Sequence, residues 1–443
     1  MSDAISILID EVRIRFGPKA AITDPADIEP WLTDWRGRFH GQAQAILSPS
    51  STEEVAEIVK LAATHRVPLV PQGGNTSMVG GATPPADGSV LILSLRRMNR
   101  LRSISAQHNV AIAEAGMILA QLHEEAAAVG RRFPLTLGAR GSCTVGGLIS
   151  TNAGGTQVLR FGTMRALVAG LEAVLPDGSI HNGLSGLKKD NRGYNLDQLL
   201  IGAEGTLGIV TAAALRLVPA LYSRAVGWAG VSDPQAALAL LRDFEAKTDR
   251  IEGFELVPGD SLALVLRHIP GTRNPLEGEH PWHVLIEATS STADLDPAEL
   301  LQGLLAGAIE DKLVEDAMVA SSEAQADALW RIRDSISEAE RTEGPSTAHD
   351  ISVAVADMPR FLLEAKAAVE SAFPGTIASA FGHLGDGNLH FHVRAGSRAT
   401  PGWNESEGHE IERFVDDLVT AAGGSISAEH GIGQMKRGEL ERL

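Results

Sequence analysis

Residues 68–81 read PLVPQGGNTSMVGG, an apolar segment that runs directly into a glycine-rich loop. Before it, residues 51–66 place Ser51 and Glu54 at capping-box spacing, and apolar residues follow at helical intervals. The predicted order is therefore a helix, a strand and a loop. Clustered glycines allow backbone amides to face an anion without side chains in the way. Taken alone, this loop is as compatible with structural turns as with a ligand site.

Two further stretches repeat this glycine-rich character. Residues 134–162 read PLTLGARGSCTVGGLISTNAGGTQVLRFG, and residues 201–211 read IGAEGTLGIVT. Together with residues 68–81 they favour a long, extended polar ligand. No stretch is a GxGxxG that opens a helix after a first strand, or a GxxxxGK[ST], which disfavours an ordinary dinucleotide fold or a P-loop. Short strands, turns and occasional helices up to about residue 219 predict an α+β domain.

Composition limits the class of protein. At 443 residues the chain predicts two or three domains. The net charge of −18, with no basic stripe, argues against nucleic acid as a partner. No apolar run is long enough to span a membrane, and acidic residues within residues 1–17 predict an amphipathic helix, not a signal peptide. With Cys143 as its single cysteine, the chain is expected to be cytoplasmic.

The character of the sequence changes near residue 220. Helical patterns such as PQAALALLRDFEAKT alternate with strand candidates such as HVLIEAT (283–289), which predicts an antiparallel sheet with helices on one face. We therefore expect a first domain over residues 1–219, a second over residues 220–415 and a C-terminal segment over residues 416–443.

A histidine-rich turn lies at residues 381–393, which read FGHLGDGNLHFHV. Asp-Gly is a strong hairpin signal, and a two-residue turn at this dipeptide would place His383 directly opposite His390. Opposed residues share one face of a sheet, so the two imidazoles could converge on one metal ion. His392 shares that face without an assigned role. The alternative is that all three are ordinary structural histidines.

A third ligand must come from elsewhere, and residues 427–437, SAEHGIGQMKR, offer Glu429 and His430. Two histidines and one carboxylate leave coordination positions open, as a catalytic metal requires.

The three glycine stretches, in this order and spacing, resemble the FAD-binding half of the vanillyl-alcohol-oxidase/p-cresol-methylhydroxylase superfamily. Together with LWRIRD (329–334) and the histidine turn, they are similar to its branch of D-2-hydroxyacid dehydrogenases, which act on D-lactate, D-2-hydroxyglutarate or glycolate. The resemblance covers nearly the whole chain. It implies an FAD-binding domain of the p-cresol-methylhydroxylase type, an antiparallel-sheet substrate domain and a C-terminal segment that returns to the flavin.

The resemblance also implies which residues hold FAD. The first loop has Asn75 and Thr76 where some relatives have a histidine tethered to the flavin, so noncovalent FAD is expected, with Cys143 as a small buried residue. The implied FAD-binding residues are Gln72, Gly73, Gly74, Asn75, Thr76, Gly80, Pro134, Gly138, Ser142, Thr144, Val145, Gly146, Asn152, Gly154, Gly155, Glu204, Gly208, Ile209 and Val210.

For the reaction, the resemblance implies that His383, His390 and Glu429 bind a divalent metal, Zn or Mn, and that His430 is the catalytic base. Arg333 would bind the C1 carboxylate, assisted by Ser337 one helical turn further on, and Asn388 would contact substrate. A 2-hydroxy acid would then lose its hydroxyl proton to His430 and its C2 hydrogen, as hydride, to flavin N5.

Two departures from the resembling enzymes stand out. Hydroxyglutarate members place a lysine where this chain has Ala348, so a distal carboxylate lacks that partner unless His349 replaces it. Those enzymes also continue some tens of residues past Leu443, and weaker FAD retention is therefore expected. Expected partners are a small 2-hydroxy acid and an electron acceptor such as an electron-transfer flavoprotein, a quinone, a cytochrome or oxygen. A homodimer is one compatible assembly.

Two other functions fit parts of the pattern. A metal-dependent hydrolase would use the His/His/Glu set to activate water, with the glycine loops as structural turns. A flavin-fold scaffold with a dead site would lack chemical residues that are present in this chain.

Overall fold

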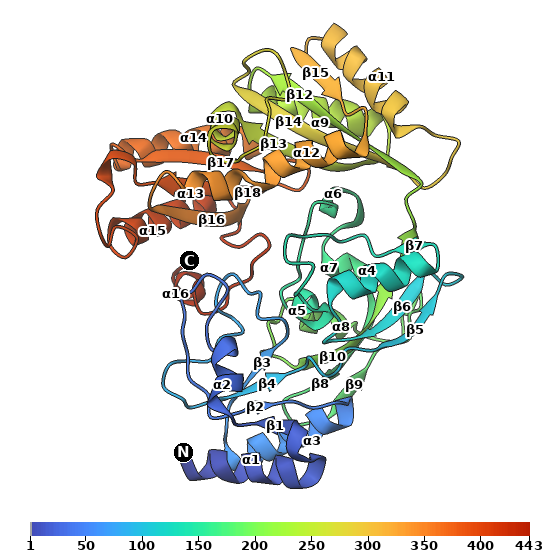
Figure 1. Ribbon diagram of the computed structural model, residues 1–443, viewed down its shortest axis with the longest axis vertical. Coiled ribbons are helices and arrows are strands. Elements are labelled where there is room, and N and C mark those ends of the chain that lie inside the picture. Colours follow the sequence, from blue (N-terminus) through green and yellow to red (C-terminus); the bar gives the residue numbers. More distant parts are fainter. Residues whose placement is uncertain (1) are drawn as a thin grey trace. The chain divides into compact units, whose positions relative to one another are not determined.

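The computed structural model describes residues 2–443, so Met1 of the predicted N-terminal helix lies outside the described residues. The chain forms two compact units (Figure 1). The first contains the chain up to Gly155, Phe161–Ala220 and Glu429–Glu441, and the second contains Thr156–Arg160, Leu221–Ala428 and Arg442–Leu443. The expected return of the C-terminal segment to the first unit is present. The domain limits at residues 219 and 415 stay a prediction.

The first unit is built on two sheets. The first has strand order β1-β2-β4-β3, in which β4 is parallel to both neighbours. The second, β5-β6-β10-β8-β9, is antiparallel throughout. The strands are β1 (Ala21–Ile22), β2 (Ile46–Leu47), β3 (Leu69–Gln72), β4 (Leu91–Ser94), β5 (Leu101–Ser105), β6 (Val110–Glu114), β8 (Val168–Val174), β9 (Ile180–Asn182) and β10 (Ile209–Arg216), with the separate pair β7 (Arg131–Arg132) and β11 (Val218–Pro219).

Helix α3 (Thr52–His65) shows how local sequence places an element in this unit. Ser51 is its N-cap and accepts a hydrogen bond from the Glu54 amide, while the Glu54 carboxylate accepts one from the Ser50 amide. The other helices are α1 (Ser2–Phe16), η1 (Pro18–Ala20), α2 (Pro25–Ile28), η2 (Glu29–Trp31), α4 (Leu119–Ala128), α5 (Val145–Ser150), α6 (Val158–Phe161), α7 (Met164–Leu167), α8 (Asp197–Leu200) and α16 (Arg437–Arg442).

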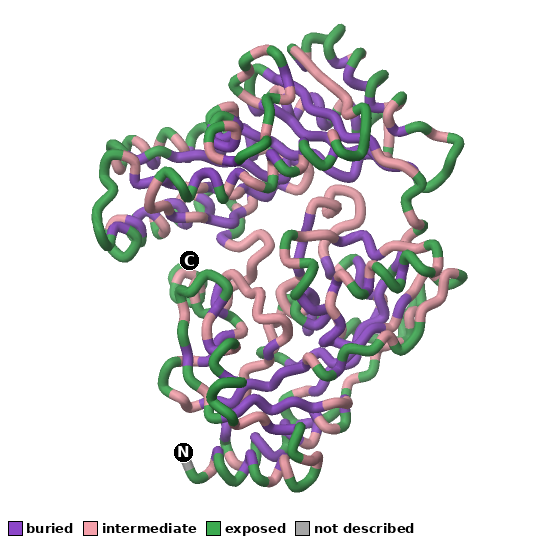
Figure 2. The backbone as a smooth tube through the Cα atoms, viewed as in Figure 1, coloured by how far each residue is buried: buried purple, intermediate pink, exposed green. Residues whose placement is uncertain are grey.

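The second unit contains one antiparallel seven-stranded sheet, in the order β15-β12-β14-β13-β17-β18-β16. Apart from the half-buried β15, its strands are buried along most of their length (Figure 2). They are β12 (Ser223–Val231), β13 (Ile251–Pro258), β14 (Trp282–Ser290), β15 (Asp316–Val319), β16 (Ser346–Ser352), β17 (Ile377–His383) and β18 (Asn388–Arg394).

The prediction of helices on one face of this sheet is wrong. Strand β14 is buried at alternating positions on both sides, with Ile286 in one apolar cluster and Leu285 in the other. A strand that is apolar on both faces needs cover on both. One face carries α9 (Pro234–Lys247), α11 (Pro297–Glu310), α14 (Met358–Ala372) and α15 (Glu407–Ala421), and the other carries α10 (Gly259–His268), α12 (Glu323–Asp334) and α13 (Ile336–Arg341), with η3 (Gly396–Arg398) after β18.

The expected single helix through Arg333 and Ser337 is two helices. Helix α12 ends at Asp334 and α13 begins at Ile336, with Ser335 as the cap between them. Arg333 and Ser337 therefore lie on different helices, and the role expected for Ser337 stays a prediction.

Candidate metal and flavin site

The histidine hairpin has a different register from the expected one. His383 pairs with Asn388, and His390 pairs with Phe381, so the loop has four residues, 384–387, instead of two. A two-residue type I′ turn needs left-handed conformations at both Asp386 and Gly387, and only Gly387 has one, with φ of 82°. The Asp386 side chain instead accepts a hydrogen bond from the Asn388 amide, at 3.0 Å.

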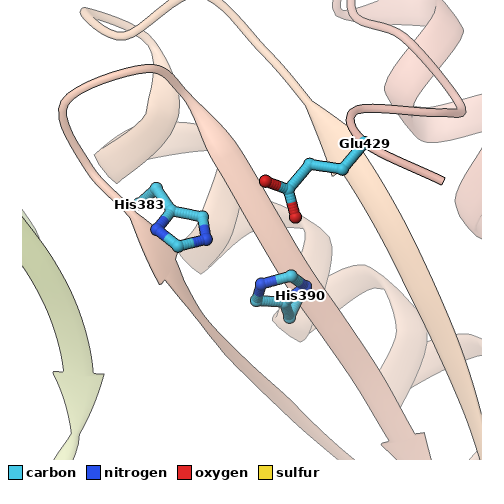
Figure 3. A group of neighbouring side chains, drawn as sticks. All are labelled: His383, His390 and Glu429. Carbon is cyan, nitrogen blue, oxygen red and sulfur yellow. The ribbon is translucent and has the colours of Figure 1, made fainter. Parts of the chain in front are cut away.

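His383 and His390 nevertheless share one face, because His390 lies two residues beyond the partner of His383. Their ring centroids are 5.5 Å apart. The ligand atoms of His383, His390 and Glu429 all lie within 4.8 Å of one another, and the three side chains point toward a common point (Figure 3). Glu429 follows Ala428, whose amide donates to the Asp350 carbonyl at 3.2 Å. This donor set fits a divalent cation.

Glu255 supports His383, and the sequence reasoning missed it. Its buried carboxylate accepts a hydrogen bond from His383 Nδ1 at 2.6 Å and so orients the ring, whose Nε2 faces Arg333 Nη2. Burial raises the pKa of Glu255, but the charges of Arg333 and His383 outweigh this effect and hold it at about 2. The available signal was a glutamate within IEGFELVP, a segment that otherwise reads as a buried strand.

Arg333 lies beside the histidines but is already paired. Its Nη2 lies 2.7 Å from Glu255 Oε2 and 3.3 Å from His383 Nε2. The guanidinium therefore sits next to the candidate metal ligands, where the expected substrate carboxylate would meet it. That role stays a prediction.

The predicted substrate contact Asn388 is buried next to Asp350. Its amide nitrogen donates to Asp350 Oδ1 at 2.9 Å and to the Ile351 carbonyl at 3.0 Å. Its Oδ1 is buried, and no hydrogen-bond partner for it occurs within residues 2–443. His430 belongs to a second convergent group with Asp350 and Glu429, so the predicted base lies beside a predicted ligand.

Burial, reinforced by Arg333 and His383, lowers the pKa of His390 well below its usual value, which favours a neutral imidazole. A neutral ring is the form that binds a metal.

His349 cannot replace the missing lysine on this face. It lies opposite Phe391, and its Nδ1 is bonded to the Phe391 carbonyl at 2.8 Å. Side chains alternate along a strand, so Ala348 and Asp350 share the face of His390. His349, which lies between them, points to the opposite face.

The first glycine loop has features suited to a large polar ligand. Gln72 and Asn75 donate through their amide nitrogens, to Ala82 O at 2.9 Å and Thr33 O at 2.8 Å, respectively. Their buried Oε1 and Oδ1 atoms have no partner within the described part of the chain. A Cβ on Gly74 would lie 1.9 Å from the Ser142 carbonyl, so the first two glycine loops lie against each other.

In the second loop, the backbone at Gly138 has free space around it, whereas Thr144 is buried. A Cβ on Gly138 would meet nothing within 4 Å, and Thr144 caps α5 through Gly147. Cys143 is buried, as expected, and burial raises the pKa of its thiol to about 11. The side-chain Oδ1 of Asn152 accepts hydrogen bonds from Thr163 Oγ1 and from the Arg165 amide.

The third loop binds the C-terminal segment. The Glu204 carboxylate accepts hydrogen bonds from the amides of Ile432 and Gly433, at 2.8 and 2.9 Å. Its side chain is therefore committed to protein, and an FAD contact at this position would fall to the backbone. Ile209 and Val210, also predicted to contact FAD, are buried in β10.

Two protein families match successive parts of the chain. The FAD binding domain family matches residues 43–183, and the family described as FAD linked oxidases, C-terminal domain, matches residues 222–443. Across residues 2–443 no helix is both long and apolar enough to cross a bilayer.

Several curated relatives match most of the chain. The D-2-hydroxyglutarate dehydrogenase of Arabidopsis thaliana is 36% identical over 96% of this chain and 74% of its own length. That of Xanthomonas citri is also 36% identical, over 94% and 87%. A putative D-lactate dehydrogenase of Schizosaccharomyces pombe is 35% identical, over 94% and 79%.

Solved structures agree in fold. An alkyldihydroxyacetonephosphate synthase has a TM-score of 0.74 at 17% identity, covering 95% of this chain and 80% of its own. A substrate-bound p-cresol methylhydroxylase also has a TM-score of 0.74, at 13% identity, covering 98% and 90%. The expected fold class is confirmed.

The expected cytoplasmic location is contradicted by the relatives. Those from Arabidopsis thaliana, Schizosaccharomyces pombe and Bos taurus are named as mitochondrial proteins. An acidic chain with one cysteine suits any reducing compartment, so these features could not separate the two locations.

Proposed function

The chain belongs to the FAD-linked oxidases, in the branch of the FAD-dependent D-2-hydroxyacid dehydrogenases, and we propose that it oxidises a D-2-hydroxy acid to the 2-oxo acid with the help of a divalent cation. Its relatives act on D-2-hydroxyglutarate or D-lactate by name, which makes these two acids the first substrates to test.

The observation that carries the proposal is the convergence of His383, His390 and Glu429 within 4.8 Å. A Zn or Mn ion there would polarise the substrate hydroxyl and lower its pKa. Glu255 orients His383 through Nδ1, and such supporting carboxylates are commonly needed for tight metal binding.

The remaining roles belong to neighbouring side chains. His430 accepts the hydroxyl proton as general base, since an imidazole titrates near neutral pH. Arg333 holds the C1 carboxylate with its guanidinium fork, and Asn388 uses its buried Oδ1 toward substrate. Ser337, which lies on α13, assists from beyond the helix break.

The three glycine loops would hold FAD noncovalently, and FAD supplies the acceptor for the C2 hydride. Support comes from the buried oxygens of Gln72 and Asn75 and from the open backbone at Gly138. The hydrolase alternative loses support, because a hydrolase that activates water with a metal does not require FAD, whereas residues 43–183 match an FAD-binding domain.

Anaerobic bleaching of the flavin tests the reaction. The purified FAD-loaded protein is mixed with D-lactate, D-2-hydroxyglutarate and their L-enantiomers. The D-acids should reduce the flavin and the L-acids should not. Failure of every D-acid, or a protein that takes up no FAD, would refute the proposal.

Substitution separates the metal ligands from the base. His383→Ala and Glu429→Ala should abolish flavin reduction while FAD stays bound, and exhaustive chelation should do the same until Zn or Mn is restored. His430→Ala should slow flavin reduction by roughly 10²–10⁴-fold with little change in substrate affinity. An unchanged rate would remove His430 from this role.

The electron acceptor is proposed to be an electron-transfer flavoprotein, a quinone or a cytochrome, with oxygen as the alternative. Reoxidation of substrate-reduced protein by each acceptor separates them. A homodimer is likewise a proposal, for which light scattering is the direct measurement.

A further inference from the structure

Asp350 is a buried carboxylate beside the candidate metal ligands, and the roles proposed above do not use it. It is 3% exposed and lies on β16, where it pairs with His390 on β18. Directly opposed residues share one face of a sheet, so the Asp350 side chain points to the same face as His390. A buried charge is costly unless it is paired and hydrogen-bonded. The neighbours of Asp350 therefore indicate what it does.

Two hydrogen bonds hold Asp350 in place. Asn388 Nδ2 donates to Asp350 Oδ1 at 2.9 Å, and the Ala428 amide donates to the Asp350 carbonyl at 3.2 Å. The first bond comes from the strand that carries His390, and the second comes from the segment that leads to His430. Asp350 is thus bonded to both parts of the chain that supply the site.

The segment before His430 runs along β16. Ser352 and Ser425 exchange two backbone hydrogen bonds, of 3.0 and 2.8 Å, and the Ala428 bond to Asp350 follows two residues away on β16. Residues 425–428 therefore lie beside this strand in antiparallel direction. His430 comes two residues after Ala428, so this pairing brings it toward the Asp350 side chain.

Asp350, Glu429 and His430 converge. Their ligand atoms all lie within 4.8 Å of one another, and Glu429 also belongs to the group formed with His383 and His390. Two arrangements are compatible with this overlap. One is a second cation bound by Asp350, Glu429 and His430. The other is a carboxylate–imidazole pair of Asp350 and His430 beside a single cation.

The number of ligands favours the pair over a second cation. Glu429 is shared, so a second cation would have only Asp350 and His430 as ligands of its own. Catalytic zinc usually has three protein ligands, and Asp350 Oδ1 already accepts from Asn388. A cation bound to His430 would also prevent this ring from accepting the substrate proton.

The chemistry of a carboxylate determines how its partners are oriented. An ionised carboxylate accepts hydrogen bonds and donates none. Asn388 accordingly turns its amide nitrogen, and not its Oδ1, toward Asp350. By the same rule, His430 would turn an N–H toward Asp350. The other nitrogen of the neutral ring then carries no proton and can accept one.

We propose that Asp350 is a positioning residue for the base: its carboxylate accepts the N–H of one ring nitrogen of His430, and the other ring nitrogen takes the proton of the substrate hydroxyl. This inference rests on the proposed oxidation of D-2-hydroxy acids. The substrate O–H bond breaks, the proton moves to His430, and the C2 hydride goes to FAD, so that a 2-oxo acid forms. Asp350 stays ionised and stabilises the resulting imidazolium. Such hydrogen bonds often tighten only when substrate is bound.

Asp350→Asn tests this role, because the amide keeps the shape but can donate to His430 and so favour the wrong ring tautomer. For the FAD- and Zn-loaded protein, anaerobic flavin reduction by the better of D-lactate and D-2-hydroxyglutarate should slow by about 10²–10⁴-fold. The half-saturating substrate concentration should stay within about threefold. Asp249→Asn, whose side chain is 84% exposed, is the matched control and should change neither quantity. An unchanged rate in Asp350→Asn would overturn the inference.

A double variant separates positioning from a structural role. If Asp350 acts only through His430, adding Asp350→Asn to His430→Ala should slow flavin reduction by no more than about twofold beyond His430→Ala alone. A larger further loss would show that Asp350 acts independently of His430, which contradicts the proposal.

Zinc binding distinguishes the pair from a second cation without any turnover. Calorimetric titration of the metal-free protein should give a single Zn per chain, and Asp350→Asn should bind the same amount. Two Zn ions per chain in the unaltered protein, one of them lost in Asp350→Asn, would assign Asp350 to a second metal site. Loss of the single Zn would make Asp350 a ligand, and either result rejects the positioning role.

Asp350→Glu keeps the inference testable if Asp350→Asn does not fold. It retains the charge and displaces the carboxylate by one methylene group, which should slow flavin reduction by about tenfold or more with Zn still bound. An unchanged rate would again reject the role. If no D-acid reduces the flavin of the unaltered protein, the proposed function fails and the inference fails with it. If reduction proceeds equally in the unaltered protein and the Asp350 variants, only the inference fails.

Discussion

At the scale of single residues, Glu255 links the guanidinium of Arg333 to the imidazole of His383. It accepts hydrogen bonds from both Arg333 and His383 and is 1% exposed. Removing one partner of a buried ion pair leaves the other charge uncompensated, at a cost of about 3–5 kcal/mol.

Glu255→Gln keeps the shape of the side chain and removes its charge. The free energy of unfolding in urea should fall by roughly 3 kcal/mol, and the affinity for Zn should fall by about 10–100-fold, because His383 loses its orienting carboxylate. Glu310→Gln, an exposed change on α11, serves as the control and should alter neither quantity. An unchanged free energy of unfolding would show that the ion pair between Arg333 and Glu255 does not stabilise the protein.

His283 predicts a pH dependence of stability. It is 2% exposed and lies between the rings of Trp228 and His280, with centroids 5.9 and 5.8 Å away. Burial, with a smaller effect of His280, lowers the pKa of His283 to about 4. The unfolded chain binds this proton more readily, near pH 6.5. His283 therefore contributes its full stability above about pH 6.5, and this contribution declines as the pH falls toward about 4.

His283→Gln should remove up to about 3 kcal/mol of the loss in stability across this window. The measurement is the free energy of urea unfolding at several pH values, compared with the exposed change His409→Gln. A variant that loses stability as steeply as the unaltered protein would contradict the assignment.

At the scale of elements, the four-residue hairpin loop depends on Gly387. Its φ is 82°, and a Cβ there would lie 2.1 Å from the Val353 carbonyl. Left-handed backbone and close approach both require glycine. This residue therefore holds the two strands that carry His383 and His390.

Gly387→Ala should lower the free energy of unfolding by about 3 kcal/mol and weaken Zn binding, because the loop must shift. Gly303→Ala on α11, where an added Cβ meets nothing within 4 Å, is the matched change and should be neutral or stabilising. Calorimetry of both variants with and without Zn is the measurement. Equal melting temperatures would exclude strain at Gly387.

At the scale of the whole molecule, a short segment that lies in the sequence between two parts of the first unit belongs to the second unit. Thr156–Arg160 directly follows the predicted flavin residues Gly154 and Gly155, yet belongs to the second unit. Arg160 Nη1 lies 2.6 Å from Glu252 Oε1 and 3.1 Å from Thr289 Oγ1. Leu159 packs against the apolar core, where a Cβ on Gly385 would lie 2.6 Å from it.

Arg160→Ala should destabilise the second unit by about 3 kcal/mol, because Glu252 is 1% exposed and loses its guanidinium partner. Limited proteolysis should then cleave within residues 221–428 faster than in the unaltered protein. Arg192→Ala, at an exposed arginine paired within its own loop, should leave the cleavage rate unchanged. Faster cleavage confined to the first unit would contradict this anchoring role.

Through its resemblance to a known family, the sequence by itself predicted the flavin-binding fold, which is confirmed, and named His383, His390 and Glu429 as metal ligands, which stays a prediction. Glycine runs and helix caps act through neighbouring residues, so their physical consequences can be predicted from local sequence. The order of three glycine stretches was specific enough to indicate FAD, and the histidine turn with Glu429 indicated a divalent ion.

Only the tertiary structure decided what depends on distant partners. The hairpin register shifted because a side-chain bond from Asp386 competes with a tight turn. Glu255 met His383 because β13 pairs with β17, strands that are more than a hundred residues apart. His349 faced away from the histidines, and His392 faced Ala348, through the pairing of β16 with β18. Strand pairing sets which side chains share a face, and no local pattern in the sequence specifies that partner.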